Sequence, residues 1–150
     1  MSNQKARRKA REFALQGIYQ WLISGNGVAL IEEHIAQADD FDKADQAFFT
    51  ERLRGTIARA EAHDVEIARH IDRKVDELSP VEHAVLLLAT EELVTHIDVP
   101  YRVVINEAIE LTKAFGGSEG HRFVNGVLDK MAAVLRAVEV EAAGRNKKGK

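Results

Sequence analysis

The sequence predicts an all-α protein of about seven helices, and three observations support this prediction. Apolar residues recur at spacings of three and four along almost the whole chain of 150 residues. Strong helix formers dominate the composition, and no segment has a convincing strand pattern. The hydrophobic fraction of 45% excludes a disordered protein and supplies a sizeable core. We therefore expect a single helical domain over residues 1–150.

The first half of the chain contains four predicted helices. Residues 4–24 form an amphipathic helix, which ends at residues 24–27 because Gly25 and Gly27 tolerate the left-handed conformation. A short helix follows at 28–38. An acidic loop at 39–45 then supplies capping residues for a helix at 45–61. Asp64 is the predicted cap of a fourth helix, which directs four apolar residues inward: Ile67, Ala68, Ile71 and Val75.

The second half begins with the clearest helix start in the sequence. The Ser79 side chain can accept a hydrogen bond from the Glu82 amide, the Glu82 carboxylate can reach back, and Pro80 suits the first helical position. The helix at 80–96 is predicted to be the most buried, because residues 85–89 are all apolar. A turn at 98–100 leads into a helix that ends at 115–117. Ser118 is the predicted cap of a last helix over 119–139.

Positive charge is concentrated at both ends of the chain. Residues 1–11 contain five basic side chains and residues 145–150 contain four, whereas all 24 acidic side chains lie in residues 12–144. Clustered Lys and Arg can bind a polyanion, because they displace counterions from its phosphates. The N-terminal run leads directly into a helix and is the stronger candidate. The C-terminal run is either a second such arm or a solvated tail, and its lack of aromatic neighbours favours the tail. We expect flexible basic ends at 1–6 and 140–150.

The sequence contains no motif that is typical of a catalytic site or of a bound metal. The chain has no cysteine, which excludes a disulfide framework, a thiol nucleophile and a cysteine zinc site. The six histidines never have the spacing of a His-Glu-x-x-His motif; His63 and His70 could share a helix face, but two surface histidines fit better. The glycines at 116–120 could offer amides to a phosphate, but the P-loop lysine is missing, so we interpret them as a turn. We expect no enzyme activity, no cofactor and no metal.

Residues 13–31 contain no charged side chain, yet they are unsuited to a membrane span or a signal peptide. Four polar residues interrupt the segment and three glycines weaken it. We therefore predict a cytoplasmic protein.

One region combines aromatic and basic residues near helix ends. Residues 121–123 (His-Arg-Phe) open the last predicted helix, Phe115 closes the preceding one, and residues 101–102 (Tyr-Arg) begin that one. Single-stranded RNA is bound in this way, by rings that stack on bases and basic groups that hold phosphates. Alternatively, Phe115 and Phe123 are core residues, and spacing alone favours that interpretation. On a helical wheel Phe123 borders the apolar stripe, so both orientations fit.

Several segments resemble the NusB family of bacterial transcription antitermination factors. Residues 104–116 (VINEAIELTKAFG) followed by 121–130 (HRFVNGVLDK) resemble the family signature. Residues 6–12 (ARRKARE), with Ala14-Leu15-Gln16 and Tyr19, resemble its arginine-rich first helix, and residues 98–101 (DVPY) match its turn. The resemblance runs from about residue 5 to 136. Residues 28–62 match only in helical pattern, and the tail after 136 does not match.

The resemblance implies two packed three-helix-like subdomains without catalytic activity. It implies a transcription antitermination factor that binds the boxA RNA element together with NusE, a small-subunit ribosomal protein. The complex joins RNA polymerase and other Nus factors, notably in ribosomal RNA operons. By position, the implied RNA-binding residues are Arg7, Arg8, Lys9, Arg11, Gln16, Tyr19, Arg102, Phe115, His121, Arg122 and Phe123. The implied NusE-binding residues are Glu77, Glu82 and Glu92.

Two other interpretations use the same features. RNA cytosine methyltransferases carry a similar helical domain at the N-terminus, so the chain could be a related RNA-binding or scaffold module without catalysis. A scaffold without an RNA role would leave the basic N-terminal arm unexplained. The resemblance also allows a homodimer, because some members of the family self-associate through the RNA face.

Overall fold

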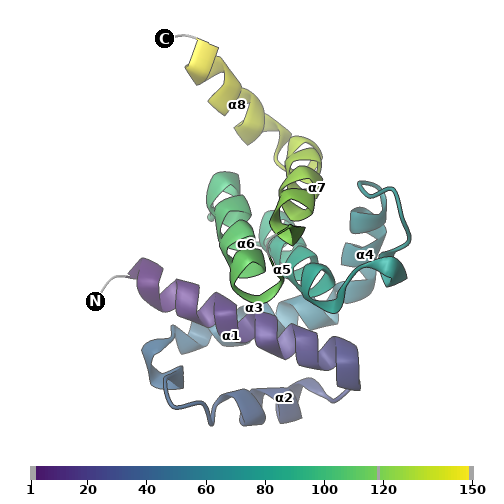
Figure 1. Ribbon diagram of the computed structural model, residues 1–150. Coiled ribbons are helices and arrows are strands. Elements are labelled where there is room, and N and C mark those ends of the chain that lie inside the picture. The colour runs from purple at the N-terminus through teal and green to yellow at the C-terminus, as the bar shows by residue number, and fades with distance from the viewer. Residues whose placement is uncertain (1–2, 118, 149–150) are drawn as a thin grey trace.

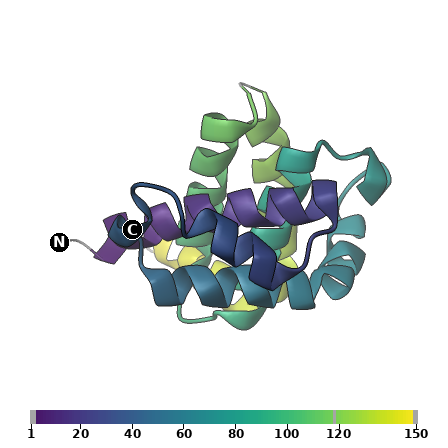
Figure 2. The ribbon, with the colours of Figure 1, turned by 90° about the horizontal axis from the view of Figure 1, so that it is seen from below.

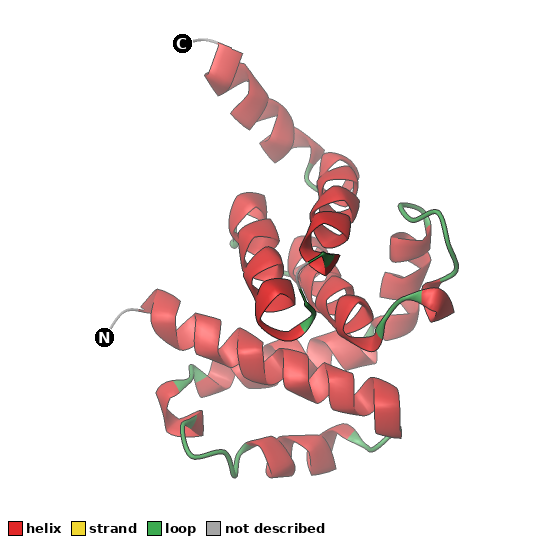
Figure 3. Cartoon of the chain, in the orientation of Figure 1, coloured by secondary structure: helices red, strands yellow, loops and turns green. Residues whose placement is uncertain are grey.

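The computed structural model describes residues 3–117 and 119–148. Within these residues the chain forms α-helices and two short 3₁₀ helices, and it has no strand, as predicted (Figure 1, Figure 3). No helix among them is long and apolar enough to cross a membrane. The elements are α1 (Asn3–Ser24), α2 (Val28–Ile35), η1 (Phe41–Lys43), α3 (Gln46–Ala58), α4 (Ala60–Ala68), η2 (Val75–Glu77), α5 (Pro80–Thr95), α6 (Tyr101–Phe115), α7 (Gly120–Leu135) and α8 (Ala137–Lys148).

The helices form the two subdomains that the resemblance implies. Helix α1 packs against α2 and α3 in one group, and α5, α6 and α7 pack together in the other, with α4 against α5. Figure 2 shows α2 and α3 alongside α1. The groups meet where α1 and α3 contact α5. Gly17 allows the close packing of α1, because a Cβ there would lie 2.7 Å from Leu53 Cδ1 of α3.

Helix α5 is the centre of the core, as its apolar run predicts. Every residue from 84 to 93 is buried, and its start has the predicted Ser79 cap, with the Glu82 amide 3.2 Å from Ser79 Oγ. Only half of the predicted capping box forms, since no return bond from the Glu82 carboxylate is present among the described residues. Instead that carboxylate lies beside Gly120, where a Cβ would be 2.8 Å from Glu82 Oε2.

Several predicted boundaries differ from the structure: α2 and α3 end three residues before the predicted 38 and 61, and three further differences follow. Asp64 lies inside α4 rather than at its start, and its carboxylate pairs with His83 Nε2 of α5 at 2.7 Å. Helix α4 ends at Ala68, so Ile71 and Val75 pack on the core from the following loop and η2. The last helix breaks at Arg136, which adds an eighth α-helix, α8, to the described residues. The predicted cap Ser118 lies outside the described residues.

Arg136 interrupts the last helix because its side chain binds the end of α5. This buried guanidinium donates to the backbone carbonyls of Leu93, Glu92 and His96 at 2.8, 3.2 and 3.1 Å. The Glu92 and His96 carbonyls also accept from the backbone amides of His96 and Val99, at 3.0 Å each, so Arg136 adds to the backbone hydrogen bonds that end α5. Beyond Arg136, α8 extends away from the bundle (Figure 1). Residues 3–6 and 140–148 are therefore helical, and their predicted flexibility stays a prediction.

Candidate nucleic-acid interface

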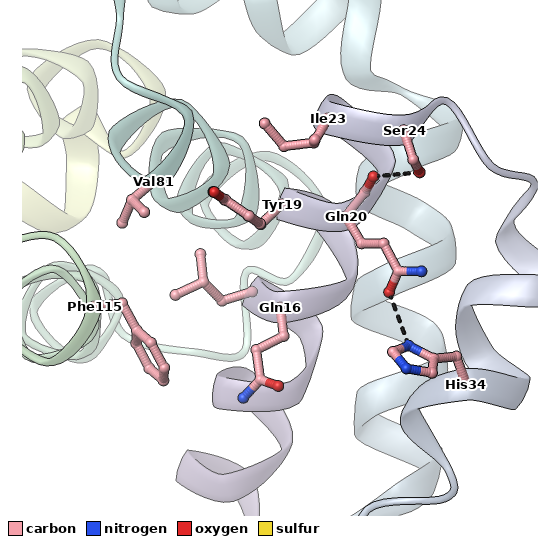
Figure 4. Close-up of a pocket in the computed structure, with 9 residues that line it drawn as sticks. Gln16, Tyr19, Gln20, Ile23, Ser24, His34, Val81 and Phe115 are labelled. Carbon is pink, nitrogen blue, oxygen red and sulfur yellow. Dashed lines mark hydrogen bonds between the residues drawn. The ribbon is translucent and has the colours of Figure 1, made fainter.

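A groove of about 550 Å³ opens between the second half of α1, α2, the start of α5 and the end of α6 (Figure 4). Figure 4 shows Gln16 and Tyr19 projecting from α1 towards the side on which Val81 and Phe115 lie. Three of the predicted RNA-binding residues, Gln16, Tyr19 and Phe115, thus come together here. The groove is lined by Leu15, Gln16, Tyr19, Gln20, Ile23, Ser24, His34, Val81 and Phe115.

The groove exposes large apolar side chains that a closed core would bury. Tyr19 is 41% exposed, Phe115 42% and Ile23 60%. The turn after α6 holds Phe115 in place, because Gly116 packs against Val81 and Gly117 adopts a φ of 88°. Exposed apolar surface of this kind is typical of a binding site. Aromatic rings beside an amide such as that of Gln16 can stack on bases and contact their edges.

One face of α1 leads into the groove from its basic N-terminal end. At 100° per residue, Arg8, Glu12, Gln16, Tyr19 and Ile23 lie within an arc of about 80°. Arg8 sits at the start of this stripe and makes a bidentate pair with Glu107 of α6, at 3.0 and 3.2 Å. The hydrogen bonds and the charge of Glu107 raise the pKa of Arg8 above its ordinary value.

The other basic residues of α1 point around the helix instead of sharing one surface. The exposed Arg7 guanidinium lies 5.1 Å from the centre of the Phe48 ring of α3. Lys9 pairs with Asp40, whose hydrogen bond and charge raise the pKa of Lys9. The predicted arginine-rich cluster is therefore divided, and Arg8 alone among Arg7, Arg8 and Lys9 lies on the stripe that leads to the groove.

Arg11 and Glu92 are buried, which corrects their predicted roles in RNA and NusE binding. Arg11 is 4% exposed and Glu92 2%. Their side chains form a bidentate pair at 2.7 and 2.8 Å, and Arg52 Nε lies 3.4 Å from the same carboxylate. The two residues join α1 to α5 at the contact between the subdomains. A residue so enclosed cannot meet a partner at the surface, because leaving the pair would strand a buried charge.

A second buried carboxylate, Glu91, lies next to this pair. It accepts from Arg59, and its Oε1 is 2.8 Å from His63 Nε2. Burial alone raises the pKa of Glu91, but the hydrogen bonds from His63 and Arg59 outweigh burial and lower the pKa from 4.5 to about 2. Gly55 of α3 makes room for the pair, because a Cβ there would clash with the Glu91 carboxylate. We refer to Arg11, Arg52, His63, Glu91 and Glu92, together with the exposed Arg59 that pairs with Glu91, as the buried ionic cluster.

Arg102 lies outside the groove, at the opposite end of α6. It is 13 residues from Phe115, which corresponds to about 20 Å along the helix axis. Its side chain is exposed and its Cζ lies 5.9 Å from the centre of the Tyr101 ring. An RNA that contacts both Phe115 and Arg102 has to run along α6.

The predicted residues at the start of α7 also lie apart from the groove lining. Arg122 is exposed, with its Nη1 3.9 Å from Glu119, and His121 is half-buried. Phe123 is half-buried, and the guanidinium of Arg73 lies over its ring at 4.5 Å. We expected Phe115 as the neighbour of Phe123, but no aromatic contact between them occurs among the described residues. The sequence does not indicate the contact between Arg73 and Phe123, because 50 residues separate them.

The two remaining acidic candidates lie near the start of α5. Glu77 is exposed in η2, where its carboxylate accepts a hydrogen bond from the Lys74 amide at 3.3 Å. Glu82 is half-buried and immediately follows Val81, which lines the groove. Glu82 therefore follows a groove residue directly, whereas Glu77 lies in the preceding 3₁₀ helix.

Other groove residues had a signal that the sequence analysis did not use. Leu15, Tyr19 and Ile23 follow one another at intervals of four on α1, and together they make an apolar strip along the groove. Gln20 and His34 bridge α1 to α2 at the far edge, with Gln20 Oε1 3.2 Å from His34 Nδ1. That contact joins residues 14 positions apart and leaves no local trace in the sequence.

The chain is similar to characterised proteins along most of its length. Residues 8–133 match the model of the NusB family. The transcription antitermination protein NusB of Aromatoleum aromaticum is 61% identical, over 97% of this chain and 100% of that protein. The protein of the same name from Azoarcus sp. (strain BH72) is 59% identical, over 98% of this chain and 96% of that protein.

Solved structures match the fold as well. T. maritima NusB is 31% identical, covers 85% of this chain and 91% of its own, and gives a TM-score of 0.75. A structure of the antitermination factors NusB and NusE in complex with double-stranded RNA gives a TM-score of 0.73 at 22% identity, over 83% of this chain and 93% of that one. The second likeness concerns the fold alone.

Proposed function

The chain belongs to the NusB family, and on this basis we propose that it is a transcription antitermination factor that binds boxA RNA together with NusE. In this role it supports ribosomal RNA transcription within the RNA polymerase complex that contains other Nus factors. The proposal assigns no catalytic activity to the chain and places it in the cytoplasm.

The observation that carries this proposal is the groove, with its two half-exposed rings. Tyr19 and Phe115 offer faces on which unpaired bases can stack, and Gln16 offers an amide to base edges. Arg8 supplies charge at the end of the same stripe. Its Nε and Nη2 atoms are taken by Glu107, which leaves the Nη1 hydrogens for a phosphate.

The remaining predicted residues differ in whether their exposure and contacts leave them available to RNA. Arg7, Lys9, Arg102, His121 and Arg122 are exposed or half-buried and keep a proposed role as phosphate contacts. Phe123 keeps a proposed stacking role on the part of its ring that Arg73 leaves open. Arg11 is withdrawn from the RNA surface because the buried pair with Glu92 holds it.

For NusE, we propose that Glu77 and Glu82 face the basic partner at the rim of the groove. Charges at a rim mainly speed association and set the register of two proteins. Glu92 has no place in this surface because it is buried.

The test is binding of a boxA-like RNA and of the same nucleotides in scrambled order, with and without NusE, by electrophoretic mobility. We expect the boxA-like RNA to bind preferentially and NusE to increase that preference. Equal binding of the two RNAs in the presence of NusE would contradict the proposed function.

A further inference from the structure

The edge of the groove towards α2 carries an amide side chain that the protein itself holds in place. Gln20 of α1 and His34 of α2 both line the groove, and Gln20 Oε1 lies 3.2 Å from His34 Nδ1 (Figure 4). Gln16 lies one turn earlier on α1, and its amide makes no hydrogen bond to the other residues drawn in Figure 4. The groove thus contains two amides, of which one is free and one is held.

The two amides follow one another along the groove. Residues four apart on a helix have Cβ atoms about 5–6 Å apart. At about 100° per residue, Gln20 lies about 40° further round α1 than Gln16, on the side of its contact with α2. Tyr19 belongs to the same turn, and its ring is 41% exposed. A base that stacks on Tyr19 in this groove therefore has one amide of α1 before it and another after it.

The last turn of α1 fixes the backbone of Gln20. Ser24 Oγ donates to the Gln20 carbonyl at 2.6 Å and accepts from the Asn26 amide at 3.1 Å. The backbone and the side chain of Gln20 are thus both held, although α1 ends at Ser24. Ordering a side chain on binding costs rotamer entropy, and a side chain that is already held loses less of it. Gln20 is therefore better prepared than Gln16 for a directional contact with a ligand.

The contact with His34 leaves part of the Gln20 amide available. An amide offers an oxygen acceptor and two N–H donors, and one imidazole nitrogen engages only one of these groups. The other side chains drawn in Figure 4 make no hydrogen bond to the Gln20 side-chain amide. Sequence-specific RNA recognition uses hydrogen bonds to the edges of unpaired bases, which are held by stacking on aromatic rings. The ligand group that suits the free side of this amide is a base edge.

We propose that Gln20 is a specificity-determining residue of the groove, which contacts the edge of one unpaired base, and that His34 is its positioning residue. The inference rests on the proposed function, because it presupposes an RNA in the groove. It adds to that function a residue that distinguishes one base from another, whereas stacking on Tyr19 and Phe115 accepts any base. Without His34, the amide rotates freely and distinguishes bases less well.

The experiment measures base discrimination position by position. In a boxA-like RNA, each base is exchanged in turn for the other base of the same ring size, uracil for cytosine or guanine for adenine and the reverse. Such exchanges keep the stacking surface and change the hydrogen-bonding groups at the edge. The readout is the ratio of the affinities of the original and the exchanged RNA. Because both affinities are measured on the same protein, a variant that is partly unfolded still gives a valid ratio.

The proteins are the full chain, Gln20→Leu, His34→Leu, His34→Asn, the double variant with both leucine changes, and the control Gln37→Leu. Gln37 is exposed in the turn after α2 and does not line the groove. We expect Gln20→Leu to lower the ratio at one position by about 2- to 10-fold, which corresponds to one hydrogen bond, and to leave the other positions unchanged. The control should give the profile of the full chain.

The His34 variants test the positioning role. His34→Leu should lower the ratio at the same position as Gln20→Leu, because the amide is then no longer held. His34→Asn should retain most of the ratio, since an amide there can replace the ring Nδ1 as the partner of Gln20. The double variant should match Gln20→Leu, because His34 acts through Gln20. A purely structural link between α1 and α2 would change stability and leave every ratio unchanged.

Two results would overturn the inference. One is a profile of ratios that Gln20→Leu leaves unchanged at every position, which would mean that Gln20 contacts no base edge. The other is a loss from His34→Leu that adds to the loss from Gln20→Leu in the double variant, which would mean that His34 does not act through Gln20. Failure of the proposed function looks different, because the full chain would then fail to distinguish boxA-like from scrambled RNA.

Discussion

Two faces of helix α1 differ in which kind of side chain they expose: one buries a charged residue, and the other exposes an aromatic ring. On the face towards α3 and α5, the charged Arg11 is 4% exposed, while on the face towards the groove the aromatic Tyr19 is 41% exposed. The usual distribution of polar and apolar residues is reversed at both positions. Arg11 is buried because Glu92 and Arg52 complete an ionic network around it. Tyr19 stays open because no helix of the described chain covers it.

The difference separates structural residues from candidates for binding. A buried ion pair adds little net stability, since its desolvation offsets its attraction, but it fixes how the helices meet. Exposed rings contribute little to folding and are available to a ligand. Substitutions in the buried ionic cluster should therefore change stability, and substitutions in the groove should change RNA affinity.

The largest effect is expected for Glu92→Gln. This change leaves Arg11 and Arg52 buried without their shared carboxylate, and breaking a buried pair in this way costs about 3–5 kcal/mol. Urea unfolding measures the loss. Glu110→Gln on exposed α6 surface serves as the control and should change stability by less than about 0.5 kcal/mol. Similar stabilities for the two variants would mean that the buried network is dispensable.

Acid should weaken the protein through Glu91. Its pKa is about 2 in the folded protein and 4.5 ordinarily, so the carboxylate stabilises the fold above about pH 4.5. That stabilisation, about 3 kcal/mol, is lost as the pH falls from about 5 to 2. Unfolding by urea at several pH values should show a smaller dependence over this window for Glu91→Gln than for the parent. An unchanged dependence would contradict the lowered pKa.

Phe115→Ala tests the groove. Loss of one stacking ring should weaken RNA binding by about 1–3 kcal/mol. Stability should hardly change, because the ring is 42% exposed. Ile97→Ala is a matched control, since Ile97 is 75% exposed and lies in the turn after α5, away from the groove lining. If Phe115→Ala unfolds the protein and leaves RNA affinity intact in the folded fraction, the ring belongs to the core.

The smallest effect is expected for Arg8→Ala. If Arg8 holds one phosphate of single-stranded RNA, its loss should reduce the salt slope of binding by about 0.7. The pair with Glu107 is exposed on the arginine side, so its loss should cost stability little. Glu107→Gln is the informative counterpart: it frees Arg8 and should leave the slope intact or increase it. An unchanged salt slope for Arg8→Ala would mean that Arg8 does not contact the RNA.

Local signals in the sequence were enough to predict most of the fold. The apolar period placed α1, α5 and α6 within a residue or two of their ends, and the Ser79 cap marked the start of α5 correctly. The break at Arg136 had no such signal, because the carbonyls that it binds lie 40 to 44 residues earlier in the chain.

The site was less accessible to sequence reasoning for the same reason. Resemblance to the family placed Gln16, Tyr19 and Phe115 in one set, and the structure brings them into one groove, although their RNA role stays a prediction. The same positional argument failed for Arg11 and Glu92. These two residues are 81 apart in sequence, and only the packing of α1 on α5 reveals that they neutralise each other.

The cap that Arg136 places on α5 has a consequence for synthesis of the protein. Helix α5 leaves the ribosome before the guanidinium that binds its last carbonyls, because Arg136 follows 43 residues after Leu93. At typical bacterial elongation rates of about 5–20 residues per second, this interval lasts about 2–9 seconds. During that time the central helix of the core has been synthesised, but its C-terminal end lacks the hydrogen bonds from Arg136. The α5 end acquires its side-chain cap only after Arg136 has been translated and has left the ribosome.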